Sequence, residues 1–251
     1  MSLNLRVQSS EFIDETVRIS FKFNGKTYYG FKGDTLASAL LANNIHLIGR
    51  SFKYHRPRGI MTAGSEEPNA IVQINDNTNV TEPNVRATEV EIYEGLEASS
   101  QNCWPSVNFD IGGINNAISA FLPAGFYYKT FMWPASFWEK YEFFIRHSAG
   151  LGKSPTEKDP DIYDHRNIHC DVLVVGAGIS GILAAKNAAK NNLKTLLVDE
   201  KNELGGATIY QNRDFNKIEN QSSSDWIKKE IQEYNIWKYL FVCFNNGNVK
   251  S

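Results

Sequence analysis

The sequence predicts two folded parts in series: a small α+β domain with a β-grasp arrangement, and then the start of an α/β domain with a parallel sheet. Three observations support this fold class. Residues 17–31 alternate between apolar and polar side chains, and a helical pattern follows at once. A polar, proline-containing stretch over 150–169 is typical of a linker. Beyond it, a β-branched strand leads into a glycine-rich turn and an alanine-rich helix. We therefore expect a β-grasp domain over 15–100, an aromatic-rich connecting region and linker over 101–169, and a partial α/β domain over 170–251.

The composition is that of an ordinary globular protein, with 42% hydrophobic and 22% charged residues and a net charge of −2. This balance gives no reason to expect binding to nucleic acid or to an acidic membrane surface. The N-terminus has no basic segment followed by an apolar run, and no apolar stretch reaches the ~18 residues of a membrane span. The three cysteines are far apart and form no CxxC pair. This argues against a metal site or a disulfide framework and favours a cytoplasmic location.

The first domain begins with a predicted β-hairpin. Asn24-Gly25 lies at the centre of the alternating segment, and this dipeptide suits the positive φ angles of a two-residue turn. Asp34 precedes a helical pattern and is the expected N-cap. The remaining expected features are a helix face formed by Leu36, Leu40 and Leu41, a helix end at Asn43-Asn44, and short strands near Ala70–Ile74 and Thr88–Ile92.

Residues 50–58, with the sequence RSFKYHRPR, form a basic segment that we expect to be a loop. The segment shows no periodicity, and Pro57 blocks a regular helix. Two interpretations stay open. The segment is either a solvated loop or a loop that docks on a partner subunit or an anionic cofactor.

Residues 121–144 hold eleven aromatic side chains interrupted by lysines and glutamates. These charges exclude a membrane span, and so many aromatic rings need a large surface to cover them. That surface is either the chain itself or a protein–protein interface. The aromatic residues are Phe121, Phe126, Tyr127, Tyr128, Phe131, Trp133, Phe137, Trp138, Tyr141, Phe143 and Phe144.

The second domain opens with a pattern that is typical of dinucleotide binding. Residues 171–175 (DVLVV) are a β-branched and aliphatic run, which suits a strand buried on both faces of a parallel sheet. A helix-prone segment, Ile182–Lys190, and a second apolar strand over 195–198 follow. A GxGxxG turn between such elements is the Rossmann-type fingerprint. The turn consists of Gly176, Ala177, Gly178, Ile179, Ser180 and Gly181.

Each glycine of the turn has an expected physical role. Gly176 permits the tight turn, Gly178 lets the backbone approach a pyrophosphate, and Gly181 allows close packing of helix on strand. The N-terminus of the helix offers free N–H groups and its positive dipole end to the phosphates. We therefore expect the ADP part of NAD or FAD to bind here. The alternative is a Rossmann-like fold that has lost its ligand.

A carboxylate at the end of the second strand completes the predicted site. The spacing favours Asp199, and Glu200 is the alternative because strand ends are uncertain by a residue or two. Such a carboxylate accepts hydrogen bonds from the adenosine ribose and repels a 2′-phosphate, which disfavours NADP. A glycine pair soon after it either closes the loop over the nucleotide or forms a plain turn. That segment consists of Glu203, Leu204, Gly205, Gly206 and Ala207.

With these residues placed, the chain resembles the N-terminal part of the α subunit of heterotetrameric sarcosine oxidase. The resemblance covers roughly residues 15–235. It rests on Gly49–Gly59 (GRSFKYHRPRG), Gly64–Asn69 (GSEEPN), Leu122–Pro134 (LPAGFYYKTFMWP) with Phe137–Lys140, and Asp171–Ala207.

The resemblance implies a complex that oxidatively demethylates sarcosine to glycine. Hydrogen peroxide is formed together with formaldehyde, or with methylenetetrahydrofolate when tetrahydrofolate is present. The resemblance also implies NAD in the Rossmann domain of this chain, FMN between the α and β subunits, and FAD in the β subunit. The implied partners are the β, γ and δ subunits, and the folate site is implied to lie in the C-terminal part of the α subunit.

Two departures from the family matter. Family α subunits are several times longer, whereas this sequence ends after its first βαβ unit and one more predicted helix near 225–234. We therefore expect a truncated or fragmentary subunit without the folate domain. Related N-terminal domains carry cysteines for a [2Fe–2S] cluster, whereas none occurs between Met1 and Asn102. We therefore expect a ferredoxin-like fold without the cluster.

No catalytic arrangement stands out in the sequence, so the catalytic residues stay unknown at this stage. The histidines are scattered, and each is expected to be a surface or packed side chain: His46, His55, His147, His165 and His169. Besides the flavoenzyme subunit, two interpretations stay open. One is a non-catalytic interaction or assembly module, and the other is a subunit of a related amine- or opine-oxidising flavoprotein.

Overall fold

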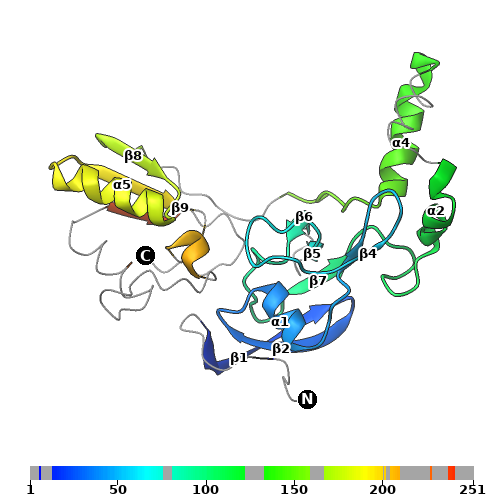
Figure 1. Ribbon diagram of the computed structural model, residues 1–251, viewed down its shortest axis with the longest axis horizontal. Coiled ribbons are helices and arrows are strands. Elements are labelled where there is room, and N and C mark those ends of the chain that lie inside the picture. The colour runs from blue at the N-terminus through cyan, green and yellow to red at the C-terminus, as the bar shows by residue number, and fades with distance from the viewer. Residues whose placement is uncertain are drawn as a thin grey trace. The chain divides into compact units, whose positions relative to one another are not determined.

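The computed structural model describes residues 6, 13–75, 81–121, 133–158, 167–199, 201, 204–209, 227 and 237–240. The chain divides into two compact units, 1–159 and 160–251. Figure 1 shows the elements of both units.

The first unit is built on a hairpin of β1 (Asp14–Phe23) and β2 (Lys26–Lys32). The two strands pair antiparallel, with Phe23 opposite Lys26. Between them, Asn24 and Gly25 adopt φ angles of 50° and 75°, as a two-residue hairpin turn requires. The hairpin predicted at this dipeptide is confirmed.

Five strands form the sheet of the first unit, in the order β2-β1-β7-β5-β6. β5 is Ile71–Asn75, β6 is Thr81–Arg86 and β7 is Glu97–Ser100. β1 and β7, the first and last strands along the chain, lie parallel at the centre, and the other pairs are antiparallel. This is the β-grasp arrangement predicted from the sequence. β3 (Gly49–Arg50) and β4 (Pro57–Arg58) form a separate two-stranded ladder.

The strand expected near Thr88–Ile92 is wrong, because these residues form a turn with a single bridge at Glu91. The strand that pairs with β5 comes earlier, as β6. The turn segment instead bonds to the start of α1 (Leu36–Ala42), where Leu36 N donates to Val90 O at 2.7 Å. Its alternating apolar side chains are buried in the core, which accounts for the strand-like pattern.

Thr35, and not Asp34, is the N-cap of α1. The Thr35 hydroxyl accepts a hydrogen bond from Ser38 N at 3.2 Å. The Asp34 carboxylate is fully buried and accepts hydrogen bonds from the Arg6 guanidinium, from the Ser38 hydroxyl at 2.7 Å and from Phe31 N at 2.9 Å. Asp34 therefore ties three parts of the unit together instead of capping one helix.

The buried face of α1 packs against the sheet (Figure 1). Leu36 and Leu40 are fully buried, as expected, but Leu41 is 37% exposed and does not belong to this face. Ala37 and Ala39 take its place in the core. The largest side chains that complete the core are Phe21, Phe23, Ile48, Val72, Ile74, Ile92 and Leu96.

The basic segment over 50–58 fastens the connecting region to the β-grasp domain. The Arg50 guanidinium donates to Val107 O at 2.7 and 2.9 Å and to His55 O at 3.2 Å. The buried His55 places its Nδ1 2.7 Å from Oδ2 of Asp110. Arg56 Nε donates to Asn116 Oδ1 at 2.8 Å, so at least three of the five basic side chains of this segment make internal hydrogen bonds. The helical elements that follow are Ile111–Gly113, α2 (Ile114–Ala117), Ser119–Phe121, Ala135–Phe137 and α4 (Trp138–Ala149).

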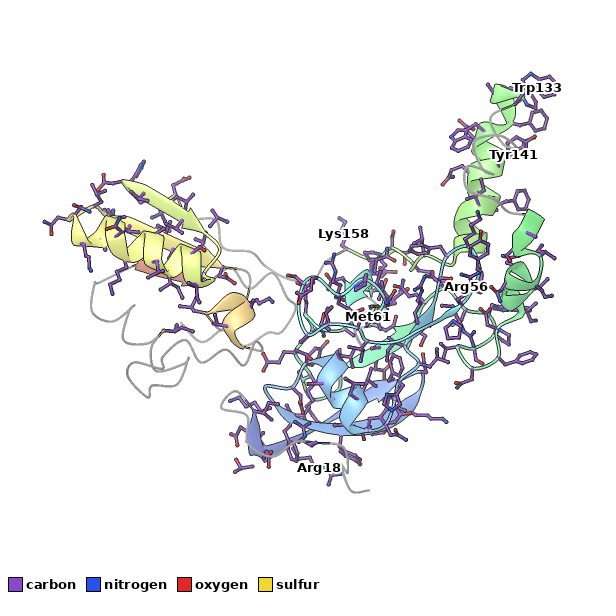
Figure 2. The ribbon with its side chains drawn as sticks, in the orientation of Figure 1. Arg18, Arg56, Met61, Trp133, Tyr141 and Lys158 are labelled. Atoms are coloured by element: carbon purple, nitrogen blue, oxygen red, sulfur yellow. The ribbon has the colours of Figure 1, made fainter. Side chains whose placement is uncertain are left out.

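The described part of the aromatic segment is largely exposed. Trp133 is 83% exposed and Phe144 is 69% exposed, and Figure 2 labels Trp133 and Tyr141 beside α4. Within the described ranges, no helix is both long and apolar enough to cross a bilayer. Further exposed rings are Phe137, Trp138 and Phe143, whereas Phe126, Tyr127, Tyr128 and Phe131 lie outside the described residues.

The second unit contains a βαβ arrangement of β8 (Val172–Val175), α5 (Ile179–Lys190) and β9 (Thr195–Asp199). The two strands are parallel, and α5 lies across one face of them (Figure 1). A further strand, β10 (Trp237–Leu240), pairs parallel with the other edge of β9, so the order is β10-β9-β8. The sequence pattern did not predict β10. A short helix, Gly206–Ile209, follows β9.

The expectation that β8 is buried on both faces is wrong for the described residues. Leu173 is 56% exposed and Val175 is 77% exposed, whereas Val174 packs against the core beneath α5. The described residues thus cover only the α5 side of this strand. A continuous apolar run in the sequence does not show whether a strand is buried on both faces or on one face only.

Candidate nucleotide-binding site

The glycine-rich turn joins β8 to α5 and is packed closely against the helix. Gly176 has a φ of 97°, which glycine adopts without strain, and its N–H donates to Val198 O at 2.8 Å. A Cβ atom on Gly181 would lie 1.8 Å from Gly176 O. Because no side chain fits there, glycine at position 181 lets the N-terminus of α5 pack directly against the backbone of the glycine-rich loop.

The N-terminus of α5 offers donors beside open space. Gly178 is the N-cap, and no side chain caps the helix. The first N–H groups of an α-helix have no partner within the helix, and a Cβ on Gly178 would meet nothing within 4 Å. Ile179 is half-buried and Ser180 is exposed in this first turn. Free donors and the positive end of the helix dipole favour an anionic group such as a phosphate at this point.

A second glycine loop is bonded to the first. Gly205 N donates to Ala177 O at 2.8 Å, and Gly178 and Gly205 form an isolated parallel bridge. A Cβ on Gly206 would lie 3.1 Å from the Cα of Gly178. The buried Thr208 hydroxyl donates to Gly205 O at 2.7 Å and holds this loop from the other side. The two glycine segments therefore form one backbone framework.

Asp199 lies at the end of β9 with its carboxylate turned toward the glycine turn. One oxygen, Oδ2, accepts a hydrogen bond from Ala177 N. The other, Oδ1, accepts from Lys201 N at 2.8 Å. Each carboxylate oxygen has a second lone pair, so both can still accept a bond from a ligand hydroxyl. The alternative acid, Glu200, lies outside the described residues.

The structure thus brings most of the sequence-predicted residues to one place, and it adds one that the sequence analysis did not name. Thr208 supports the second glycine loop, and its position two residues after a glycine pair carries no recognisable signal. Ala207 is exposed at the start of the short helix. The residues gathered around the framework are Gly176, Ala177, Gly178, Gly181, Asp199, Gly205 and Gly206.

The other polar side chains that suggest chemistry have structural partners. Oδ1 of Asp110 accepts bonds from Trp104 N and Gly112 N at 3.0 and 3.1 Å, while its other oxygen binds His55. A Cβ on Gly112 would lie 2.2 Å from His55 Nδ1, so the backbone of Gly112 packs directly against this ring. His46 is exposed and bonds to Asn44. Among the residues that the structure describes, no three His, Cys, Asp or Glu side chains cluster as metal ligands do.

Two family models match the chain. A 2Fe-2S iron-sulfur cluster binding domain matches residues 16–103, and an FAD dependent oxidoreductase domain matches residues 171–234. The first match covers the β-grasp sheet and the second covers the βαβ arrangement with both glycine segments. A ferredoxin-like domain followed by the start of an FAD dependent oxidoreductase domain is therefore confirmed.

Curated relatives extend this similarity over nearly the whole chain. The sarcosine oxidase subunit alpha of Rhizobium meliloti (strain 1021) is 52% identical over 229 residues, which are 91% of this chain and 23% of that protein. That of Corynebacterium sp. (strain P-1) is 31% identical over 88% of this chain and 18% of that protein. The resemblance inferred from the sequence is confirmed, and the chain spans about a quarter of the length of its Rhizobium relative, or less for the other. Among solved structures, L-proline dehydrogenase from P. horikoshii aligns with 94% of this chain and 34% of its own at 17% identity, with a TM-score of 0.49 that is too low to carry a conclusion.

Proposed function

We propose that this chain, which is similar to the N-terminal part of sarcosine oxidase α subunits, is the nucleotide-binding part of such a subunit. The observation that carries the proposal is the framework around Gly178. There a helix N-terminus without a side-chain cap, a glycine that leaves open space and the Asp199 carboxylate lie together. A diphosphate needs the first two features, and an adenosine ribose needs the third.

NAD is the nucleotide that we propose for this chain. Its pyrophosphate would bind at the N–H groups of Ile179–Gly181, and its adenosine ribose would bind at Asp199. FAD shares the same ADP part and is the alternative, supported by the family model over residues 171–234. NADP is disfavoured because its 2′-phosphate would approach the Asp199 carboxylate.

Replacing Gly178 with leucine is expected to abolish binding of NAD, FAD and ADP while the chain stays folded. The leucine side chain would occupy the free space beside the helix N-terminus, and no neighbour lies within 4 Å of its Cβ. The measurement is calorimetric titration of the full chain with each nucleotide, with circular dichroism to verify folding. The matched control is Asn187→Ala, because Asn187 is exposed on the same helix but lies outside the proposed phosphate site. Unchanged affinity in the Gly178 variant would exclude the assignment, and tighter binding of FAD than of NAD would favour the alternative.

In the complete complex, we place this subunit with β, γ and δ partners in the cytoplasm. A flavin bound there supplies the acceptor for the electrons of amine oxidation. We propose FMN and FAD for that role, with sarcosine as substrate and tetrahydrofolate as the one-carbon acceptor. The present chain contributes nucleotide binding and a docking surface, and no catalytic side chain is assigned to it.

The isolated 251-residue chain is expected not to oxidise sarcosine. Oxidation requires a flavin held over the amine, and the proposed flavin sites involve other subunits. The measurement is hydrogen peroxide release from the purified chain supplied with FAD, FMN and sarcosine. Turnover well above that of a reaction without protein would contradict the assignment of the flavin sites to other subunits. Activity that returns when the remaining α sequence and the β subunit are supplied would support it.

A non-catalytic assembly module is the second candidate function, and the exposed aromatic rings favour it. Trp133, Phe137 and Phe144 present apolar surface that the described residues of their unit leave uncovered, and exposed rings of this kind are enriched in protein interfaces. The two candidates predict different nucleotide binding. A chain that binds no nucleotide but still joins the complex would be an assembly module alone.

A further inference from the structure

The loop between β4 and β5 is organised around one buried acid, Glu67, whose side chain is only 1% exposed. Its Oε2 accepts hydrogen bonds from Met61 N and Thr62 N, both at 2.7 Å. Its Oε1 accepts from Asn69 N at 2.8 Å and from Ala70 N at 3.1 Å. Four backbone donors from both ends of the loop thus converge on one carboxylate. Figure 2 labels Met61 at the start of this loop.

The backbone around Glu67 is held from the opposite side as well. Glu67 N donates to Gly64 O at 3.1 Å, and that carbonyl also accepts the Thr88 hydroxyl at 2.7 Å. Arg86 Nε donates to Glu67 O at 3.1 Å, while its Nη1 lies 3.3 Å from Glu89 Oε2. The loop is therefore a closed hydrogen-bonded structure with the carboxylate at its centre.

This loop lies inside the range that matches an iron-sulfur cluster binding domain, residues 16–103. A [2Fe–2S] cluster needs four thiolates, or two thiolates and two imidazoles. The matched range contains one cysteine, Cys103. Burial, together with the Asp110 carboxylate, raises the pKa of the Cys103 thiol and so opposes the thiolate form. The residues present do not fit a cluster.

We propose that the Glu67 carboxylate organises the loop over 61–70 in place of an iron-sulfur cluster, so that this domain is an iron-free scaffold. A cluster fixes its loop by binding several points of the chain at one centre. The Glu67 carboxylate binds four points of the chain at one centre with backbone N–H donors. The proposal is independent of the nucleotide site, which lies in the other unit.

The arrangement requires an ionised carboxylate, because a protonated one accepts fewer hydrogen bonds. Burial by itself would raise the pKa of Glu67, but the four backbone N–H donors outweigh it and hold the pKa below its usual range. The charged groups near this backbone are Arg86, which binds the Glu67 carbonyl, and Glu89, which pairs with Arg86. The stabilisation is therefore fully present above the unfolded pKa of about 4.3 and is lost as the pH falls through the lower folded value.

The test is hydrogen exchange of the full chain, read by mass spectrometry on peptides that cover 59–70. Replacing Glu67 with glutamine is expected to speed exchange in this loop about tenfold or more, because an amide offers one acceptor oxygen instead of two. The matched control is Glu66→Gln, since the Glu66 side chain is exposed. Wild-type protein incubated with ferrous iron and sulfide under anaerobic conditions is expected to gain neither stoichiometric iron nor visible cluster absorption.

Two outcomes would overturn the proposal: unchanged exchange in the Glu67 variant, or a stoichiometric cluster in the wild-type chain. If the Glu67 variant does not fold, the pH series of the wild type decides. Protection of the loop that falls below pH 4 ahead of the β1 and β2 peptides supports the proposal. Protection that stays level with those strands throughout the acid range contradicts it.

Discussion

Replacing Gly181 with valine is expected to remove nucleotide binding and to unfold the βαβ arrangement of the second unit. A Cβ at this position would lie 1.8 Å from Gly176 O and 3.0 Å from the carbon of the same carbonyl. Both atoms belong to the backbone of the turn, so no side-chain rotation relieves the clash. Either α5 moves away from β8 or the turn opens, and each movement separates the helix N-terminus from Asp199.

The free energy of unfolding of this unit is expected to fall by about 3 kcal/mol or more, at the upper end of overpacking substitutions, because rigid backbone must shift. Hydrogen exchange over peptides of β8, α5 and β9 measures it for this unit alone. The matched control is Gly178→Ala, whose Cβ would meet no atom within 4 Å and which is expected to leave exchange in these peptides nearly unchanged. Equal exchange in the two variants would show that close packing at Gly181 does not hold the unit together.

The elements that the sequence predicted correctly are set by short-range rules. Asn24-Gly25 forms a hairpin because the dipeptide itself accepts the required positive φ angles. Leu36 and Leu40 are buried because their spacing places them on one helix face. The clash that a side chain at Gly181 would cause follows equally from local geometry, since the turn and the helix are adjacent in the chain. In each case the partners lie within a few residues of one another.

The features that the sequence did not predict depend on partners far along the chain. The turn at Thr88–Ile92 has a strand-like pattern because its apolar residues pack near α1, which the alternation cannot reveal. β10 is a strand through its pairing with β9, about forty residues earlier. The sequence did not predict the structural role of Glu67, because its four donors are recognisable only once the loop is closed. Predicting these features needs the fold itself.

The role of Asp34 also depends on a partner far along the chain. A polar residue before a helix is a good N-cap, and the sequence favoured Asp34 for that reason. The folded chain gives the cap to Thr35 and uses Asp34 as the buried partner of Arg6. The Arg6 side chain is 13% exposed, and its Nε has no hydrogen-bond partner within the described residues. The positive charge of the buried guanidinium is therefore balanced by the carboxylate of Asp34.

Replacing Asp34 with alanine is expected to destabilise the first unit by about 3–5 kcal/mol, because it leaves the Arg6 charge buried and unpaired. The Ser38 hydroxyl and Phe31 N would lose their acceptor at the same time. The measurement is hydrogen exchange over the β1, β2 and α1 peptides in increasing urea.

The control for this substitution is Glu97→Gln, which breaks the exposed Lys22–Glu97 pair. Such an exposed pair is expected to contribute less than about 1 kcal/mol. Combining the Asp34 substitution with Arg6→Met separates two contributions to the loss of stability. One is the unpaired charge of Arg6, and the other is the loss of the hydrogen bonds to Ser38 and Phe31. If the buried charge dominates, the double variant should recover part of the stability that the Asp34 variant loses, because no unpaired charge remains. If the loss of stability in the double variant equals the sum of the losses in the two single variants, the ion pair between Asp34 and Arg6 does not govern the stability of the hairpin and helix. The hydrogen bonds of Asp34 to Ser38 and Phe31 then account for the effect.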